Sequence, residues 1–351
     1  MTADNGVNRR GFIELSAGII GGLGIPGVLG KPASGAEVNS QTGTALDPSY
    51  LEKGLTGMAR SEGWFNAHLG AAVLAGYYLC NENQLGDATI AGIKEQLDAL
   101  IRVHASQFAP FPESTADKSL IDDIPKALMP AVEGGLRAHG HAVIYASLSM
   151  RALRDAPQMA QPQLIKKLCG LSGQIARQQP EKPANPAGYA DSQAMIEATF
   201  DSLARFKHLV GRPTVRRPNF THMTTHTEAL MSLDAMGYPD LASMCHLGHR
   251  AHISASVPEF DPAEHPVDAH PATLGNVMSQ SYWESEENLN QWNKKWSESS
   301  NPNGYWVAFG HLFKVLYSYH RLIGRIKDQE KVSLCSQVLL ERYLNPNVKG
   351  G

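Results

Sequence analysis

Residues 136–155 read LRAHGHAVIYASLSMRALRD, and comparable stretches occupy 64–82, 221–236 and 304–326. Each follows a Gly or Pro break, continues with apolar residues at helical spacing, and carries histidine near its first two turns. Strand signals, meaning alternating apolar runs joined by Asn-Gly or Asp-Gly turns, are scarce along the chain. These stretches therefore predict an all-α fold.

The histidines that open these helices recur at similar intervals. His68 and His141 are 73 residues apart, His141 and His226 are 85 apart, and His226 and His311 are again 85 apart. Each interval is about twice the length of a ~40-residue helical hairpin. A ring of antiparallel hairpins brings the same end of alternate helices to one face, so we predict an α/α toroid, with an irregular helical bundle as the alternative.

Twelve helices are expected from the apolar periodicity and the Gly, Pro and Asn breaks between them. Their predicted bounds are 47–59, 64–82, 86–107, 117–129, 136–155, 161–178, 190–210, 221–236, 238–254, 271–290, 304–326 and 328–344.

The N-terminus predicts export. Asn8-Arg9-Arg10-Gly11-Phe12-Ile13 resembles a twin-arginine (Tat) signature, and a Gly-rich apolar stretch and Ser34-Gly35-Ala36 follow it. We expect a signal peptide at 1–36, a single helical domain at 37–351, and a periplasmic or secreted location reached through the Tat translocase. Since that route carries folded proteins, a cofactor can be inserted before export.

Composition excludes several classes of function. The chain beyond residue 36 holds 28 basic and 32 acidic residues, a net charge of −4, which gives no basic field for nucleic acid. No segment reaches the length of a stable membrane span, and no Gly-rich phosphate loop of a Rossmann unit follows the signal. Four scattered cysteines leave disulfide pairing open: Cys80, Cys169, Cys245 and Cys335.

Helical spacing groups polar side chains with the histidines. His141 shares a stripe with Arg137 and Tyr145, whereas His139 points nearly opposite. In the last of the four stretches, His311, Lys314 and Ser318 form a polar strip on an otherwise apolar helix, as expected of a helix that lines a lumen.

Two further histidine patterns have competing interpretations. His222 and His226 are spaced i, i+4, so both imidazoles can reach one metal ion, or they are capping or buried polar residues. His246, His249 and His252 form a stripe that we interpret as a solvated or partner-facing side of a helix.

These patterns lead to a hypothesis of an exported enzyme with a histidine-lined central pocket. His68, His141, His226 and His311 converge in it, with the other polar residues close by. In its metal-dependent or redox form, a transition metal is held by His68, His222, His226 and His311, and a small organic substrate is turned over by His141, Tyr145, Arg137 and Lys314.

Three short segments resemble the questin oxidase-like family: Phe65-Asn66-Ala67-His68-Leu69, Gly135 to His141, and Gly310-His311-Leu312-Phe313-Lys314. That family is helical and associated with Baeyer–Villiger-type oxidation. The resemblance implies oxidation chemistry and assigns no residue a role.

Two other classes stay open. A metal-free lyase or hydrolase of carbohydrate would use His141 and Tyr145 as an acid–base pair. A periplasmic binding or scaffold protein would instead use a cleft for a glycan or small molecule, lined by aromatic residues: Trp64, Tyr282, Trp283, Trp292, Trp296, Tyr305 and Trp306.

Overall fold

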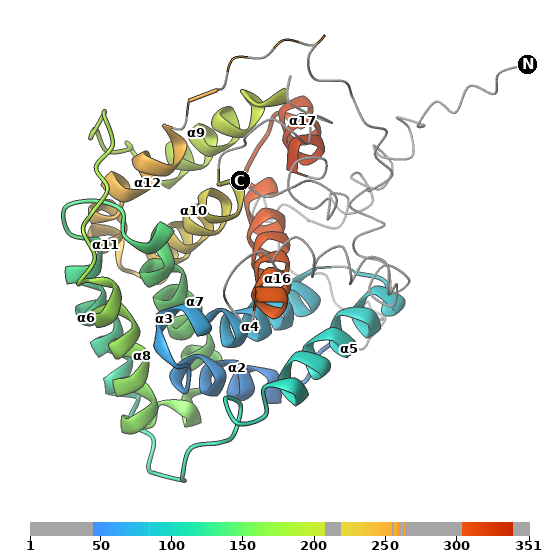
Figure 1. The fold of residues 1–351 in the computed structure, drawn as a ribbon, viewed down its shortest axis with the longest axis vertical. Helices are drawn as coiled ribbons and strands as arrows, with labels where there is room; N and C mark the ends of the chain where they lie inside the picture. Colours follow the sequence, from blue (N-terminus) through green and yellow to red (C-terminus); the bar gives the residue numbers. More distant parts are fainter. Residues whose placement is uncertain are drawn as a thin grey trace, which may run out of the picture.

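A computed structural model describes residues 45–83, 85–207, 219–254 and 304–339, with isolated positions between 256 and 263. These residues are helical, and the one extended pairing among them is a single antiparallel bridge between Leu136 and Glu181. The all-α prediction is therefore confirmed (Figure 1). The predicted signal peptide at 1–36 and the predicted helix at 271–290 lie outside the described residues.

Four helices at the centre contact one another in a closed cycle. They are α4 (His68–Glu82), α7 (His141–Asp155), α10 (Phe220–Ala235) and α16 (Gly304–Ile323). Helix α4 packs on α7, α7 on α10, α10 on α16, and α16 back on α4 (Figure 1). All four have histidine towards the N-terminal part, so the cycle brings their N-terminal parts to one face.

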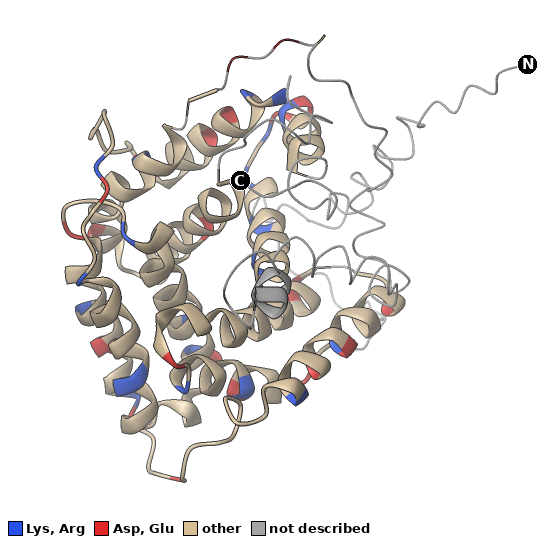
Figure 2. Cartoon of the chain, in the orientation of Figure 1, with Lys and Arg blue, Asp and Glu red and all other residues tan. Residues whose placement is uncertain are grey.

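The remaining helices surround this cycle. They are α2 (Ser49–Ala59), α3 (Gly63–Asn66), α5 (Asp87–Val103), α6 (Asp123–Val132), α8 (Pro162–Ile175), α9 (Ser192–Ala204), α11 (Pro239–Met244), α12 (His246–Ile253) and α17 (Gln329–Leu339). Helix α2 packs on α4, α6 on α7, and α9, α11 and α12 on α10. Lys, Arg, Asp and Glu are seen mainly on these outer helices (Figure 2). A complete toroid of hairpins stays a prediction.

Sequence explains which helices lie inside. In α5 only one stripe is buried, whereas almost every residue of α4 and α7 is buried. Small residues on α4 also permit close contact. A Cβ atom at Gly70 would lie 2.2 Å from the backbone nitrogen of Met58 on α2, and one at Gly310 would lie 3.1 Å from the carbonyl oxygen of His68. Gly310 thus lets α16 approach α4 beside two of the histidines.

One predicted boundary is wrong in a way that affects the site. The helix predicted at 136–155 begins at His141, because Ala138, His139 and Gly140 have φ angles of +44°, +52° and +81°. Glycine adopts positive φ without strain, and Gly140 gives the left-handed turn that places His141 as the first helical residue. Among the described residues, no helix is both long and apolar enough to cross a membrane.

Candidate metal centre

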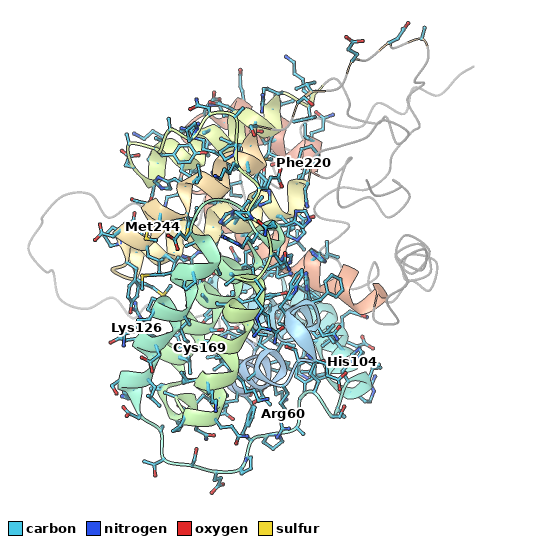
Figure 3. All side chains as sticks on the ribbon, turned by 60° about the vertical axis from the view of Figure 1, so that its left-hand side comes forward. Arg60, His104, Lys126, Cys169, Phe220 and Met244 are labelled. Carbon is cyan, nitrogen blue, oxygen red and sulfur yellow. The ribbon has the colours of Figure 1, made fainter. Side chains whose placement is uncertain are left out.

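Four imidazoles meet where the central helices come together. His68 and His141 are the first residues of α4 and α7, and His222 follows Phe220, which begins α10 and is labelled in Figure 3. With His311 of α16 they form the histidine layer. Their exposed fractions are 0 %, 2 %, 9 % and 4 % in chain order, so His222 is the most accessible of four buried rings.

The Nε2 atoms of the histidine layer follow one another round a closed loop. Successive separations are 2.7 Å for His68–His141, 3.1 Å for His141–His222, 3.3 Å for His222–His311 and 3.1 Å for His311–His68. One ligand atom from each ring lies within 4.8 Å of all the others.

Oxygen atoms behind the rings fix the tautomers. Nδ1 of His68 lies 2.5 Å from the carbonyl oxygen of Phe65, and Nδ1 of His141 contacts the carbonyl oxygen of Ala138. Nδ1 of His222 lies 2.7 Å from Oδ1 of Asn219, which also caps α10. Carbonyl oxygens only accept hydrogen bonds, so these three rings carry their proton on Nδ1 and turn the Nε2 lone pair inward.

Converging lone pairs need a cation between them. Neutral rings protonated on Nδ1 have no Nε2 proton to share, and burial makes unshared acceptors costly. Nitrogen ligands lie about 2.0–2.1 Å from zinc or a similar ion, which separates neighbouring ligand atoms by about 2.9–3.4 Å. The observed separations approach that range, so this buried group of four histidines could hold a metal ion.

Burial favours the neutral form of three of the four rings, as metal ligation requires. It lowers the pKa of His68 and His141 well below the usual value, and the nearby Lys314 lowers both further. Burial also lowers the pKa of His222, with additional effects from His141 and His311.

Other side chains surround the histidine layer. The Tyr145 hydroxyl lies 2.8 Å from Nδ1 of His68, and burial raises the pKa of this tyrosine. Trp64 packs against His141 with ring centroids 5.2 Å apart. His139 stacks on His222 at 5.1 Å, with the planes 23° apart. These contacts restrict how the ligand rings can rotate.

Lys314 is a buried cation beside the layer. It lies one turn after His311 on the same side of α16, and only 2 % of it is exposed. Burial lowers the pKa of this lysine to about 7. Tyr145 and Lys314 thus lie near the histidines, where the sequence predicted them.

The predicted set differs from the observed one at His226. The structure brings His222, not His226, to the loop with His68, His141 and His311, so His226 does not share the ion predicted for the i, i+4 pair. Four residues along α10 amount to about 6 Å of rise, which takes His226 below the plane of the other rings. There it packs against His249 and His252, with centroids 5.7 and 5.4 Å away.

Arg137 is also not where its predicted role requires. The prediction assumed a helix already formed at this residue, but its backbone is extended. Its Nε donates to the carbonyl oxygen of Gln178 at 2.7 Å, and its Nη1 donates to the carbonyl oxygens of Glu133 and Ala131. Arg137 therefore joins the end of α6 to the loop after α8.

The stripe of His246, His249 and His252 is buried, contrary to the predicted exposed face. Helix α12 packs on α9 and α10, and Tyr189 donates to or accepts from Nδ1 of His249 at 2.8 Å. Of the aromatic residues proposed for a glycan cleft, only Trp64 has a described side chain, and it packs on His141.

Sequence reasoning missed two features of the lumen. One is Asn219, whose position just before a helix is a capping signal. The other is a charged layer of Glu82, Arg151, Glu228, Tyr317 and Arg321, all nearer the C-terminal ends of the central helices than the histidines are. Its signal is Glu228, an acidic residue inside the buried part of α10.

The chain matches no protein-family model, no curated protein and no solved structure. The resemblance to the questin oxidase-like family therefore stays a prediction, and the geometry of the histidine layer carries the functional argument.

Proposed function

We propose that this chain is an exported metalloenzyme that holds one transition-metal ion on His68, His141, His222 and His311. One observation carries the proposal: four buried Nε2 atoms face one another, while three of the opposite nitrogens are held by oxygen acceptors. Imidazole is a preferred ligand of copper, iron, nickel and zinc. This donor set has no thiolate and no carboxylate.

The ion would act on a small organic substrate as a Lewis acid or redox centre. Tyr145 would hold His68 in orientation through its hydroxyl, and Asn219 would do so for His222, because both contact the nitrogen opposite the proposed ligand atom. The proposed Tat signal at 1–36 fits this function, since a protein exported in folded form can receive its ion in the cytoplasm.

Metal analysis of the purified protein tests the proposal. We expect close to one equivalent of a transition metal after loading with copper, iron, nickel, cobalt or zinc and removal of excess. His68→Asn and His311→Asn should reduce that to well below half an equivalent. Asparagine retains an amide near the Nδ1 position but has no atom in place of Nε2.

His226→Asn is the matched control, because His226 is a buried histidine of the same helix as His222 but lies outside the loop. It should keep one equivalent. A wild-type protein that binds none of these ions, or binds them equally after His68→Asn, would overturn the proposal and leave the metal-free acid–base alternative.

A further inference from the structure

The ring arrangement in the histidine layer is flattened. Neighbouring rings round the loop have centroids 4.4, 4.5, 5.1 and 4.5 Å apart, whereas His141 and His311, which face each other across it, are 6.3 Å apart. In a regular tetrahedron all six separations would be equal. The unequal separations differ from that arrangement, and an ion held by four imidazoles of this kind would leave room for a further ligand.

Among the described residues, the charge around the layer is positive. The groups that most shift the pKa values of His68, His141 and His222 are lysine, other histidines and burial, and no carboxylate is among them. Neutral imidazoles leave the full charge of a bound divalent ion in place, and a buried charge without a counter-charge is costly.

Lys314 adds to this imbalance. Among the described residues no carboxylate forms an ion pair with its ammonium group, although it is almost completely buried. Glu228, the buried acid of α10, already accepts from Tyr317 and Ser232 and pairs with Arg321. The described part of the chain thus places the Lys314 amine and the proposed ion side by side without an anion for either.

We infer that the centre takes a small organic acid, whose carboxylate completes the coordination of the ion and pairs with Lys314. This inference rests on the proposed function and names its substrate class. The bound anion would compensate both charges, and it would also keep Lys314 protonated despite its burial. Entry from the side of His222 suits a small ligand, because that ring is the most exposed of the four.

Acetate binding to the copper(II)-loaded protein tests the inference. We expect acetate to change the visible absorption and the electron paramagnetic resonance spectrum saturably, whereas acetamide, a neutral molecule of the same shape, should leave both unchanged. Lys314→Met should raise the acetate Kd at least tenfold while copper content stays at one equivalent. Lys314→Arg, which retains the charge, should restore much of the affinity.

Lys94→Met is the control, since Lys94 lies on the outer helix α5 and pairs with Asp98. It should bind acetate as the wild type does. Copper at one equivalent with no acetate response, or with the same Kd in Lys314→Met, overturns this inference and leaves the proposed function intact. Failure to bind any transition metal would instead overturn the proposed function itself.

Discussion

The central helices hold two polar layers, one buried and one partly exposed, that differ in how their groups are paired. In the charged layer, Arg151 donates to the Tyr317 hydroxyl at 2.6 Å and pairs with Glu82. Tyr317 in turn donates to Glu228 at 2.9 Å, and Arg321 lies 3.1 Å from Glu228 and 3.3 Å from Glu82. Every positive group there faces a negative one.

In the histidine layer, acceptor faces acceptor. The same four helices supply both layers, so the difference arises from side-chain chemistry and not from the backbone arrangement. Donors that are paired with acceptors stabilise a fold by themselves. Acceptors that face one another need a bound cation between them. The contrast fits a structural role for the charged layer and a histidine layer that could hold a metal ion.

Of the changes that test this comparison, metal removal should change the stability of the protein most. A ligand at 1,000 times its Kd stabilises the folded state by about 4 kcal/mol, which in a chain of this size raises Tm by roughly 8 °C. Calorimetry of the metal-loaded and the chelator-treated protein measures it. His311→Asn should have the same Tm with and without metal, and an equal response in that variant would contradict the assignment.

Breaking the charged layer should have the next largest effect. Glu228→Met leaves Arg321 and the Tyr317 hydroxyl without their shared acceptor, so we expect a loss of about 3 kcal/mol in the free energy of unfolding. Urea denaturation measures the loss. Arg321 keeps its contact with Glu82, so the loss in the free energy of unfolding should lie at the lower end of the range for a broken buried ion pair. Metal content should not change, and loss of the metal would show that the two layers are coupled.

Much of this organisation could be predicted from sequence, and what could not depended on local backbone geometry. Periodicity identified the four central helices, and the similar intervals between His68, His141, His226 and His311 indicated one face. The choice between His222 and His226 could not be made from the sequence. Side chains spaced i, i+4 point in almost the same direction from a helix but lie about 6 Å apart along its axis. Which of the two histidines lies level with the other rings depends on the residue at which α10 begins, and Asn219 caps that end of the helix.

The charged layer could not be predicted because its members come from all four central helices, at different distances along each. Glu82, Glu228 and Arg321 have no shared spacing in the sequence. The helix predicted to include Arg137 was wrong for another reason. The periodic pattern of the sequence continues through residues 138–140, and only the structure shows that their φ angles are positive.

Replacing one ligand in the metal-free protein should have a small effect, in contrast to Glu228→Met. His141→Asn retains a donor for the carbonyl oxygen of Ala138 and removes one of the lone pairs that face inward. Because no matched partner is lost, the free energy of unfolding without metal should change by less than about 1 kcal/mol. Urea denaturation in chelator measures it. A loss as large as that of Glu228→Met would mean that the rings are already paired through protons.

The smallest change in stability is expected for a variant of His226. This variant tests whether burial of a histidine is enough for metal binding. Both of its ring nitrogens are buried and have no hydrogen-bond partner among the described residues, so His226→Leu removes unsatisfied polar atoms at similar volume. Stability should be unchanged or higher by up to about 1 kcal/mol, and the Tm increase on metal loading should match that of the wild type. A variant that folds but no longer responds to metal would place His226 in the centre. A response equal to that of the wild type restricts the centre to the rings whose lone pairs meet.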